Sequence, residues 1–153
     1  MNKPKRISES ETVLSEVMMP VDANHFGSVH GGTILRLADE AAFVAATKHA
    51  RKNVVVASMD HISFQNPVSI GDILTIKARL CHVGRSSMDI EVRIETEKLK
   101  EGKVLSVGSA YITMVALDEN GKPTSVPRLI VETKRDKLKS RQAIARRKRR
   151  MAK

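Results

Sequence analysis

The chain has 153 residues, of which 41% are hydrophobic, and this is enough for one domain with a core of its own. It contains no Trp, one Tyr and three Phe, so aliphatic side chains have to build that core. No apolar run approaches the roughly 20 residues needed to cross a bilayer, which excludes a membrane-spanning helix.

The N-terminus and the single cysteine both bear on the cellular compartment. The start MNKPKRISESE is basic but lacks the apolar segment of a secretory signal. One thiol cannot form an internal disulfide or a paired-cysteine metal site, so Cys81 is predicted to be an inert core residue. We therefore expect a cytoplasmic protein without a bound metal.

The net charge of +10 comes entirely from the C-terminal end of the chain. Residues 134–153 hold 11 Lys or Arg and one Asp, whereas residues 1–133 hold 16 residues of each sign. Because the folded part is neutral, the basic pI says nothing about its ligand. We divide the chain into a domain over residues 8–123 and a basic C-terminal extension over residues 124–153, which we expect to be partly helical.

A long helix is the main predicted element. Residues 1–11 are expected to form a mobile leader, and Thr12–Met19 a first strand that Pro20 ends. The run from Thr33 to Ala50 is rich in Ala and Leu, both good helix formers. Its apolar residues form a very wide stripe, which suits a helix wrapped by a sheet better than one lying on a surface.

Two neighbouring carboxylates in this helix have different surroundings. Glu40 falls in the polar sector one turn after Arg36, which predicts an exposed ion pair. Asp39 borders the apolar stripe, about 20° from Ala46 on the helical count. A buried charge costs several kcal/mol unless it is paired. Asp39 is therefore either a boundary residue that turns back to Arg36 or a functional carboxylate.

A polar turn with Asn24 and His30 precedes the helix and ends in the pair Gly31-Gly32. Two glycines allow a sharp turn and close approach of a ligand. The first amides of a helix lack internal partners and carry the positive end of its dipole, so they could stabilise an oxyanion. The alternative is ordinary turn chemistry, with Asn24 in an Asx turn and His30 as a turn residue.

Four strand-like runs follow the helix. Val54–Met59 is predicted to be buried on both faces, and Asp60–Phe64 continues it. Ile73–Cys81 alternates, with Leu74, Ile76, Ala78 and Leu80 on the apolar side.

Ser87–Glu97 also alternates, and its polar face, which includes Asp89 and Glu91, is predicted to meet water. Val104–Leu117 is apolar on both sides and long enough to be central or to pair with another subunit. The order of one strand, a long helix and several antiparallel strands predicts an α+β fold.

The chain resembles the hotdog fold, and more narrowly the cytosolic acyl-CoA hydrolase group of hotdog thioesterases. The resemblance covers about residues 8–130. It is carried by MMPVDANHFGSVHGGTILRLADEAA, VVVASMDHISFQNPVSIGDIL, GRSSMDIEV and GSAYITMVALDENGKPTSVP. The resemblance implies a long central helix wrapped by a curved antiparallel sheet, and an enzyme that hydrolyses fatty acyl-CoA to free fatty acid and coenzyme A.

The same resemblance implies the site residues. The catalytic pair is Asn24 with Asp39, and the amides near the helix start bind the thioester oxygen. Two further sets are implied: His30, Gly31 and Gly32 at the thioester, and Gly84, Arg85, Ser86 and Ser87 at coenzyme A. No cofactor is expected, because coenzyme A enters as part of the substrate and leaves as a product.

Helix geometry predicts self-association independently. Gly32 and Asp39 are seven residues apart, or about 10 Å along a helix, whereas a base has to approach within about 3 Å of its proton or act through one water. A two-fold partner would bring Asp39 of one chain to Asn24 of the other. We expect a dimer with two shared sites, and further assembly into a trimer of dimers.

The basic extension has three open interpretations. It is a solvated or frayed terminus, the usual fate of charge blocks at chain ends. Alternatively, Lys134, Arg135 or Lys139 binds the phosphates of coenzyme A. The third interpretation is contact with an acidic membrane surface or with nucleic acid, the latter without specificity because no aromatic residue is present to stack on bases.

Two other functions stay open at this point. A hotdog hydratase or dehydratase of acyl thioesters could use Asp22, Asn24 and His30 as acid and base groups. A module that binds acyl-CoA or nucleic acid without catalysis would depend on the basic extension.

Overall fold

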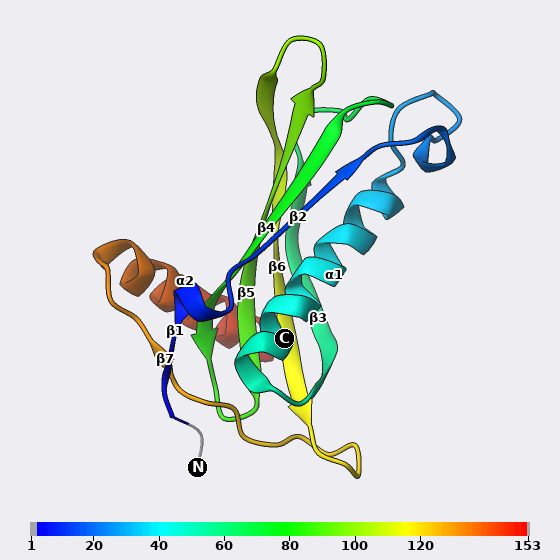
Figure 1. The fold of residues 1–153 in the computed structure, drawn as a ribbon. Coiled ribbons are helices and arrows are strands. Elements are labelled where there is room, and N and C mark those ends of the chain that lie inside the picture. The colour runs from blue at the N-terminus through cyan, green and yellow to red at the C-terminus, as the bar shows by residue number, and fades with distance from the viewer. Residues whose placement is uncertain (1–2, 153) are drawn as a thin grey trace.

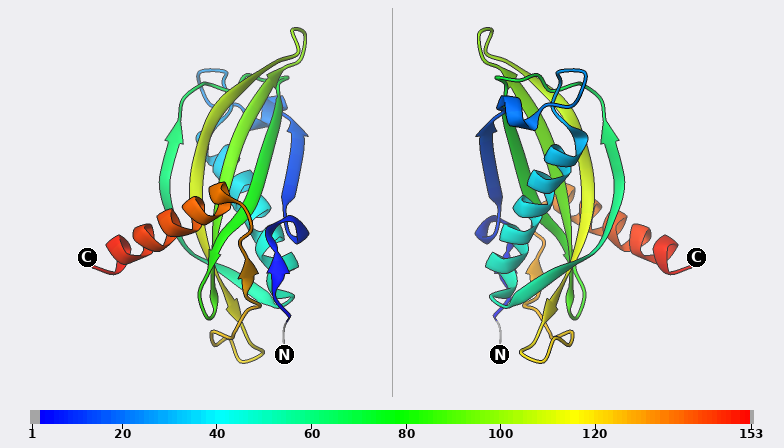
Figure 2. Two further views of the ribbon diagram at one scale, coloured as in Figure 1. Left: turned by 90° about the vertical axis from the view of Figure 1, so that its left-hand side faces the viewer. Right: turned by 90° about the vertical axis from the view of Figure 1, so that its right-hand side faces the viewer.

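The structure, a computed structural model, describes residues 3–152. A long helix, α1 (Gly31–Ala50), lies on one face of a five-stranded sheet, and a second helix, α2 (Lys134–Met151), crosses the opposite face (Figure 1, Figure 2). The predicted α+β architecture, a long helix wrapped by a curved antiparallel sheet, is confirmed.

The sheet has the strand order β2-β4-β5-β6-β3, and every neighbouring pair is antiparallel. Its strands are β2 (Thr12–Val17), β3 (Asn53–Phe64), β4 (Ile73–Val83), β5 (Ser87–Lys98) and β6 (Lys103–Leu117). All the predicted strands are present. The long apolar strand β6 lies inside the sheet, while β2 and β3 form the two edges.

The core lies between α1 and the sheet. The inward residues of β4 and β5 are the ones that alternation predicts, each at most 1% exposed: Leu74, Ile76, Ala78, Leu80, Met88, Ile90, Val92 and Ile94. Apart from His49, the fully buried residues of α1 are alanines: Ala38, Ala41, Ala42, Ala45 and Ala46. Small side chains let the helix approach the sheet closely, and this is why so apolar a helix can be wrapped.

The N-terminal segment is ordered, so the predicted mobile leader is wrong over the described residues 3–11, and residues 1–2 lie outside the described part. A short strand, β1 (Lys5–Arg6), pairs in parallel with β7 (Leu129–Ile130). The turn η1 (Ile7–Glu9) follows it and buries Ile7. Lys5 Nζ donates to the carbonyl of His49 at 2.8 Å, which satisfies the end of α1.

The prediction that Val54–Met59 is buried on both faces is wrong in the single chain. β3 is an edge strand, so it pairs with one neighbour, β6, and its other edge is open. Val55 and Val56 are 46% and 48% exposed, and Ile62 and Phe64 near its other end are also exposed. A long, aliphatic, unpaired edge is a surface that favours pairing with another chain.

The basic extension is a packed helix rather than a frayed end. α2 crosses four of the five strands, β4, β5, β6 and β3, in their order in the sheet, and contacts a charged or aromatic residue on each of these four. These contacts are Asp136 with Arg79 of β4, Lys139 with Glu91 of β5, Arg146 over the ring of Tyr111 of β6, and Arg150 with Asp60 of β3. The solvated interpretation is therefore wrong for the described residues.

This packing also corrects the prediction that Asp89 and Glu91 meet water. Each is only 6% exposed, because α2 covers this face of β5. Glu91 pairs with Lys139 Nζ at 2.6 Å, and Asp89 accepts from Thr113 Oγ1 at 2.6 Å. A charged helix can lie on this charged sheet face because Glu91 has a partner of opposite sign and Asp89 is held through Oδ1, although its Oδ2 atom is buried without a partner.

The predicted core role of Cys81 is confirmed. Its thiol is 4% exposed and donates to the carbonyl of Asp89 at 3.3 Å. Burial, and then the neighbouring Asp89, raise the pKa of Cys81 to about 12, so the thiol stays protonated and unreactive. Neither helix within residues 3–152 is both long and apolar enough to cross a membrane.

Candidate active site

Asp39 lies at the rim of the core and has no side-chain hydrogen bond or ion pair among the described residues, whereas Asp89, whose Oδ2 atom is also buried without a partner, is held through Oδ1. The Oδ1 atom of Asp39 is buried and makes no hydrogen bond among the described residues. Burial, and then the charge of Glu40, raise the pKa of Asp39 above its ordinary value. Arg36 binds Glu40 at 2.8 Å, as predicted, so the alternative in which Asp39 turns back to Arg36 is not realised. The arrangement leaves a desolvated base at the edge of the core.

The Asn24 side chain closes the turn before α1. Its Oδ1 atom accepts from the amides of Phe26 and Ser28 at 2.9 and 3.2 Å, and its Nδ2 atom donates to Ser28 Oγ at 3.1 Å. The Asx turn is therefore formed in the single chain. Because Nδ2 carries two hydrogens, one donor remains for a ligand.

The helix start presents fewer free amides than the sequence predicts. His30 is the N-cap of α1, and its Nδ1 atom accepts from the amide of Gly32 at 3.0 Å. The amide of Gly31 has no acceptor among the described residues. Since Nδ1 is an acceptor here, the proton of the neutral ring sits on Nε2. His30 is exposed, so this second N–H is available to a ligand.

The loop expected at coenzyme A is a tight turn between β4 and β5. Gly84 N–H donates to the carbonyl of Ser87 at 2.9 Å, and Arg85 accepts from the amide of Val126 at 2.8 Å. An added Cβ at Gly84 would lie 2.5 Å from Arg147 Nη1, so the Arg147 side chain would have to shift to make room for it. The loop lines a hollow of about 550 Å³ that also includes Arg128.

Arg147 of α2 is a residue of this region that the sequence does not reveal. Its Nη1 atom donates to Ser87 Oγ at 2.9 Å and so ties the helix to the loop. The two residues are 60 positions apart, and one Arg among many in a basic run carries no signal of this contact. By contrast, the prediction that Lys139 could bind phosphates meets a competitor, because Glu91 already holds it.

These parts do not meet within one chain. The Asn24 turn lies at the N-terminal end of α1, whereas Ser86 accepts from the amide of Ala116 at the far end of β6. Figure 1 shows these two loops at opposite ends of the molecule. Asp39 lies between them, about 10 Å along the helix from Gly32.

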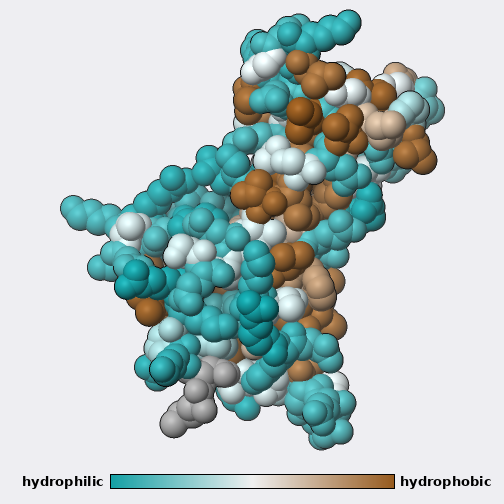
Figure 3. Space-filling view, in the orientation of Figure 1, coloured by the Kyte–Doolittle hydropathy of each residue, from teal (hydrophilic) through white to brown (hydrophobic). Residues whose placement is uncertain are grey.

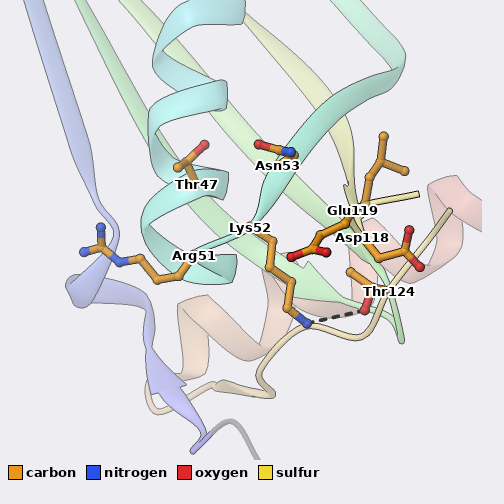
Figure 4. Close-up of a pocket in the computed structure, with 8 residues that line it drawn as sticks. Thr47, Arg51, Lys52, Asn53, Asp118, Glu119 and Thr124 are labelled. Atoms are coloured by element: carbon orange, nitrogen blue, oxygen red, sulfur yellow. Dashed lines mark hydrogen bonds between the residues drawn. The ribbon is translucent and has the colours of Figure 1, made fainter. Parts of the chain in front are cut away.

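A hollow of about 670 Å³ opens at the C-terminal end of α1 (Figure 4). It is lined by Thr47, Arg51, Lys52, Asn53, Leu117, Asp118, Glu119 and Thr124. Lys52 reaches along one side of it and donates to the carbonyl of Ser125 at 2.6 Å. No residue of the predicted catalytic pair lines this hollow, so it does not mark the reaction site in the single chain.

The buried histidine of α1 has a structural role. His49 is fully buried, and its Nε2 atom bonds the carbonyl of Pro127 at 2.8 Å. Burial lowers the pKa of His49, so the ring is neutral and donates through Nε2. Within residues 3–152, no cluster of His, Cys, Asp or Glu has the arrangement of a metal site.

One helix embedded in a five-stranded antiparallel sheet, with a Gly-Gly helix start and a carboxylate set in the helix, is the architecture of the hotdog class of acyl-thioester enzymes. The chain belongs to the Thioesterase superfamily, whose profile matches residues 26–103.

Two curated relatives illustrate the range. The cytosolic acyl coenzyme A thioester hydrolase of Rattus norvegicus is 35% identical over 137 residues, which is 88% of this chain but 36% of the rat protein. This chain therefore spans about a third of that relative. An uncharacterised acyl-CoA thioester hydrolase of Bacillus subtilis is 33% identical, over 90% of this chain and 80% of the relative.

Solved structures agree in fold over nearly the whole chain. An apo-hexameric acyl-CoA thioesterase superimposes with a TM-score of 0.93 and 35% identity, covering 98% of this chain and 96% of that one. An acyl-CoA hydrolase from Staphylococcus aureus, solved with butyryl coenzyme A and coenzyme A, superimposes with a TM-score of 0.88 and 37% identity, covering 97% and 90% of the two chains.

Proposed function

We propose that this protein hydrolyses acyl-CoA to a free acid and coenzyme A, at sites that two copies of the chain share. Asp39 of one copy accepts a proton from water while the water oxygen attacks the thioester carbonyl. The C–S bond then breaks, and the thiolate of coenzyme A leaves and takes up a proton. Direct attack by Asp39, through an anhydride, is the alternative route to the same products.

One observation carries this proposal, namely the unpaired buried oxygen of Asp39. A carboxylate acceptor without a donor costs free energy in the folded chain. The raised pKa has the same origin, because burial weakens the hydration of the charged form. Carboxylates whose pKa is shifted in this way are found often at functional sites.

The residues at the start of α1 complete the chemistry from the partner copy. The free amide of Gly31 binds the thioester oxygen as it becomes negative, helped by the positive end of the helix dipole. His30 donates through Nε2, and the remaining Nδ2 hydrogen of Asn24 orients the thioester or the water. Gly32 joins only if the His30 ring leaves its amide.

The edge strand supports the shared site. The outer edge of β3 is unpaired, and several aliphatic side chains of this strand are exposed, as is Phe43 of α1. In Figure 3 apolar residues gather on the side where α1 and β3 lie, whereas the α2 side is hydrophilic. Pairing of two β3 edges would cover this surface and set the two α1 helices side by side.

The hexameric relatives suggest a larger assembly. Three β3-paired dimers would make such a hexamer, and we propose a trimer of dimers for this chain. In the folded molecule the loop Gly84–Ser87 lies at the opposite end from Asn24. A neighbouring copy would therefore have to bring this loop to the coenzyme A of a shared site. The cytoplasm, where the cited rat relative is named as acting, is the proposed compartment.

The separation of the two polar residues gives further support. Two characterised mutants of the S. aureus hydrolase replace an Asn and an Asp by Ala, and these lie 15 positions apart in that protein. Asn24 and Asp39 are also 15 positions apart. A third mutant replaces a Thr that lies 17 positions after the same Asp. The residue 17 positions after Asp39 in this chain is Val56, on the exposed edge of β3. Val56 has no hydroxyl, so the proposed mechanism gives no role to a hydroxyl at this position.

The structure weakens the case for a hydratase, because one of its proposed acid and base groups is already occupied. The Asp22 carboxylate, at the end of η2 (Pro20–Asp22), accepts from the amide of Met19 at 2.9 Å. It is therefore engaged in capping a turn rather than free for proton transfer.

Thiol release from acyl-CoAs of increasing chain length tests the proposal. The wild-type protein should release free coenzyme A, and Asp39→Asn should not. Glu40→Gln is the matched control, because it removes a carboxylate one position away that is already paired with Arg36. Consumption of an unsaturated acyl-CoA without thiol release would instead indicate a hydratase, and wild-type rates for Asp39→Asn would remove Asp39 from the mechanism.

A further inference from the structure

Helix α2 buries several charged side chains against the sheet and exposes several aliphatic ones, unlike an ordinary surface helix. Asp136 is 8% exposed, and the side chains of Lys139 and Arg150 are 26% and 28% exposed in their ion pairs with the sheet. Leu138 and Met151, in contrast, are 46% and 75% exposed. Contacts with the sheet therefore explain the residues on the inward face of α2 but not those on its outward face.

The exposed side of α2 is cationic. It carries six exposed basic residues: Lys134, Arg135, Lys137, Arg141, Lys148 and Arg149. The single acid of the helix, Asp136, is buried against Arg79 and does not offset them. Residues seven apart lie almost in line on a helix, so Lys134, Arg141 and Lys148 form one row with spacings of about 10 Å.

We propose that this outward face, made of the six cations with Leu138, Ile144 and Met151, docks the protein on an anionic lipid surface. A row of cations without acids is complementary to a layer of phosphate headgroups. Aliphatic side chains among the cations suit the boundary between headgroups and acyl chains, as in helices that lie on membranes.

Other occupants fit this face less well. Residues 134–153 contain no aromatic side chain that could stack on bases, so nucleic acid would use the cations but not the aliphatic residues. A symmetric contact between two copies through this face would oppose six cations to six cations. The lipid surface is the occupant that uses both kinds of side chain.

The placement of α2 allows such docking. The helix is tied to the sheet by its inward face, so it offers its outward face as a fixed surface and does not need to fold on binding. Figure 2 shows that its C-terminal end projects beyond the sheet, and that α1 lies on the opposite side. Docking would leave the α1 face with Asp39 free for the proposed assembly.

The benefit that docking would bring to catalysis rests on the proposed function. Long-chain acyl-CoAs are amphiphiles whose acyl chains partition into bilayers, more strongly with each added CH₂ group. An acyl-CoA hydrolase held at an anionic surface meets its substrate where the substrate is concentrated. Docking itself does not require catalysis, and the two ideas can fail separately.

The test is co-sedimentation of the full-length protein with phosphatidylcholine vesicles that do or do not contain phosphatidylserine. Each Lys or Arg near such a surface contributes about fivefold to binding. The variant Lys134→Gln/Arg141→Gln/Lys148→Gln should therefore bind anionic vesicles on the order of 100-fold more weakly. The matched control is Lys100→Gln/Lys103→Gln/Lys122→Gln, which removes the same charge from exposed positions outside α2 and should bind like wild type.

Further arms identify the occupant. Leu138→Gln should weaken vesicle binding several-fold without changing the charge, and the catalytically inactive Asp39→Asn should bind vesicles like wild type. Equal binding by the two triple variants would overturn the proposal. So would a smaller assembly for the α2 triple variant, which would make the face a subunit contact. Binding to duplex DNA as tight as to anionic vesicles, with no effect of Leu138→Gln on either, would assign the face to nucleic acid instead.

Discussion

The two helices lie on opposite faces of the same sheet and treat buried charge in opposite ways. On the α2 face, Glu91 pairs with Lys139 and Asp136 with Arg79, and Asp89, whose Oδ2 atom is buried without a partner, is held through Oδ1 by Thr113. On the α1 face, Asp39 has a buried oxygen without a partner and no side-chain hydrogen bond or ion pair among the described residues. A buried carboxylate that its neighbours hold belongs to the architecture, whereas one that none of them holds is a candidate for chemistry that needs a further molecule.

The contrast between the two faces is tested most strongly when one carboxylate on each face is neutralised. Asp39→Asn should reduce kcat on the order of 10²–10³-fold or more, as loss of a group that acts in the transition state does. It should not lower Tm, because the raised pKa of Asp39 means that the ionised carboxylate already opposes folding at neutral pH.

Glu91→Gln is the matched variant on the α2 face. It removes the buried partner of Lys139, so it should lower Tm and leave kcat close to wild type. Thiol release and thermal unfolding of both variants measure the contrast. If Asp39→Asn lost stability and Glu91→Gln lost activity, the assignment of roles to the two faces would be reversed.

A second prediction concerns the pairing on the α2 face. Lys139→Ala leaves the Glu91 carboxylate buried without its cation and should cost about 2 kcal/mol of the free energy of unfolding. Lys137→Ala is the control, because Lys137 is exposed two positions away and should change stability by less than about 0.5 kcal/mol. Urea unfolding measures both, and equal costs would show that the ion pair contributes nothing.

A third, smaller effect concerns pH. Asp39 has to be ionised to act as a base, so kcat/KM should fall on the acid side with a midpoint above the ordinary pKa of Asp. Glu40 is the second cause of that raised pKa, after burial. Removing its negative charge favours ionised Asp39, so Glu40→Gln should move the acid limb to lower pH. An unmoved or higher midpoint would mean that another group titrates.

Local periodicity predicted most of the fold. The Ala-rich stripe of α1 and the alternation of β4 and β5 are local signals, and both gave the correct buried faces. The N-terminal segment was missed because β1 is two residues long and depends on β7, more than 100 positions away. The exposed side of β3 was missed because an apolar run does not reveal whether its strand lies at the centre or at the edge of a sheet.

The candidate site could be predicted only where it depends on the local geometry of the helix. The angle of Asp39 at the rim of the apolar stripe predicted an unusual carboxylate, and the structure shows its orphan oxygen. Sequence could not show that His30 occupies the amide of Gly32, because this depends on a side-chain rotamer. Nor could it show that Arg147 holds Ser87, because ion-pair and hydrogen-bond partners in a basic run are chosen by packing across the sheet.

The central claim is that each site takes Asn24 from one copy and Asp39 from its partner. Asn24→Ala and Asp39→Asn, each inactive alone, should therefore regain activity when they are unfolded together and refolded as mixed assemblies. Random pairing leaves one intact composite site in each mixed dimer, so about one quarter of the wild-type activity should return. If mixed assemblies form and no activity returns, the site lies within a single chain and the account is contradicted.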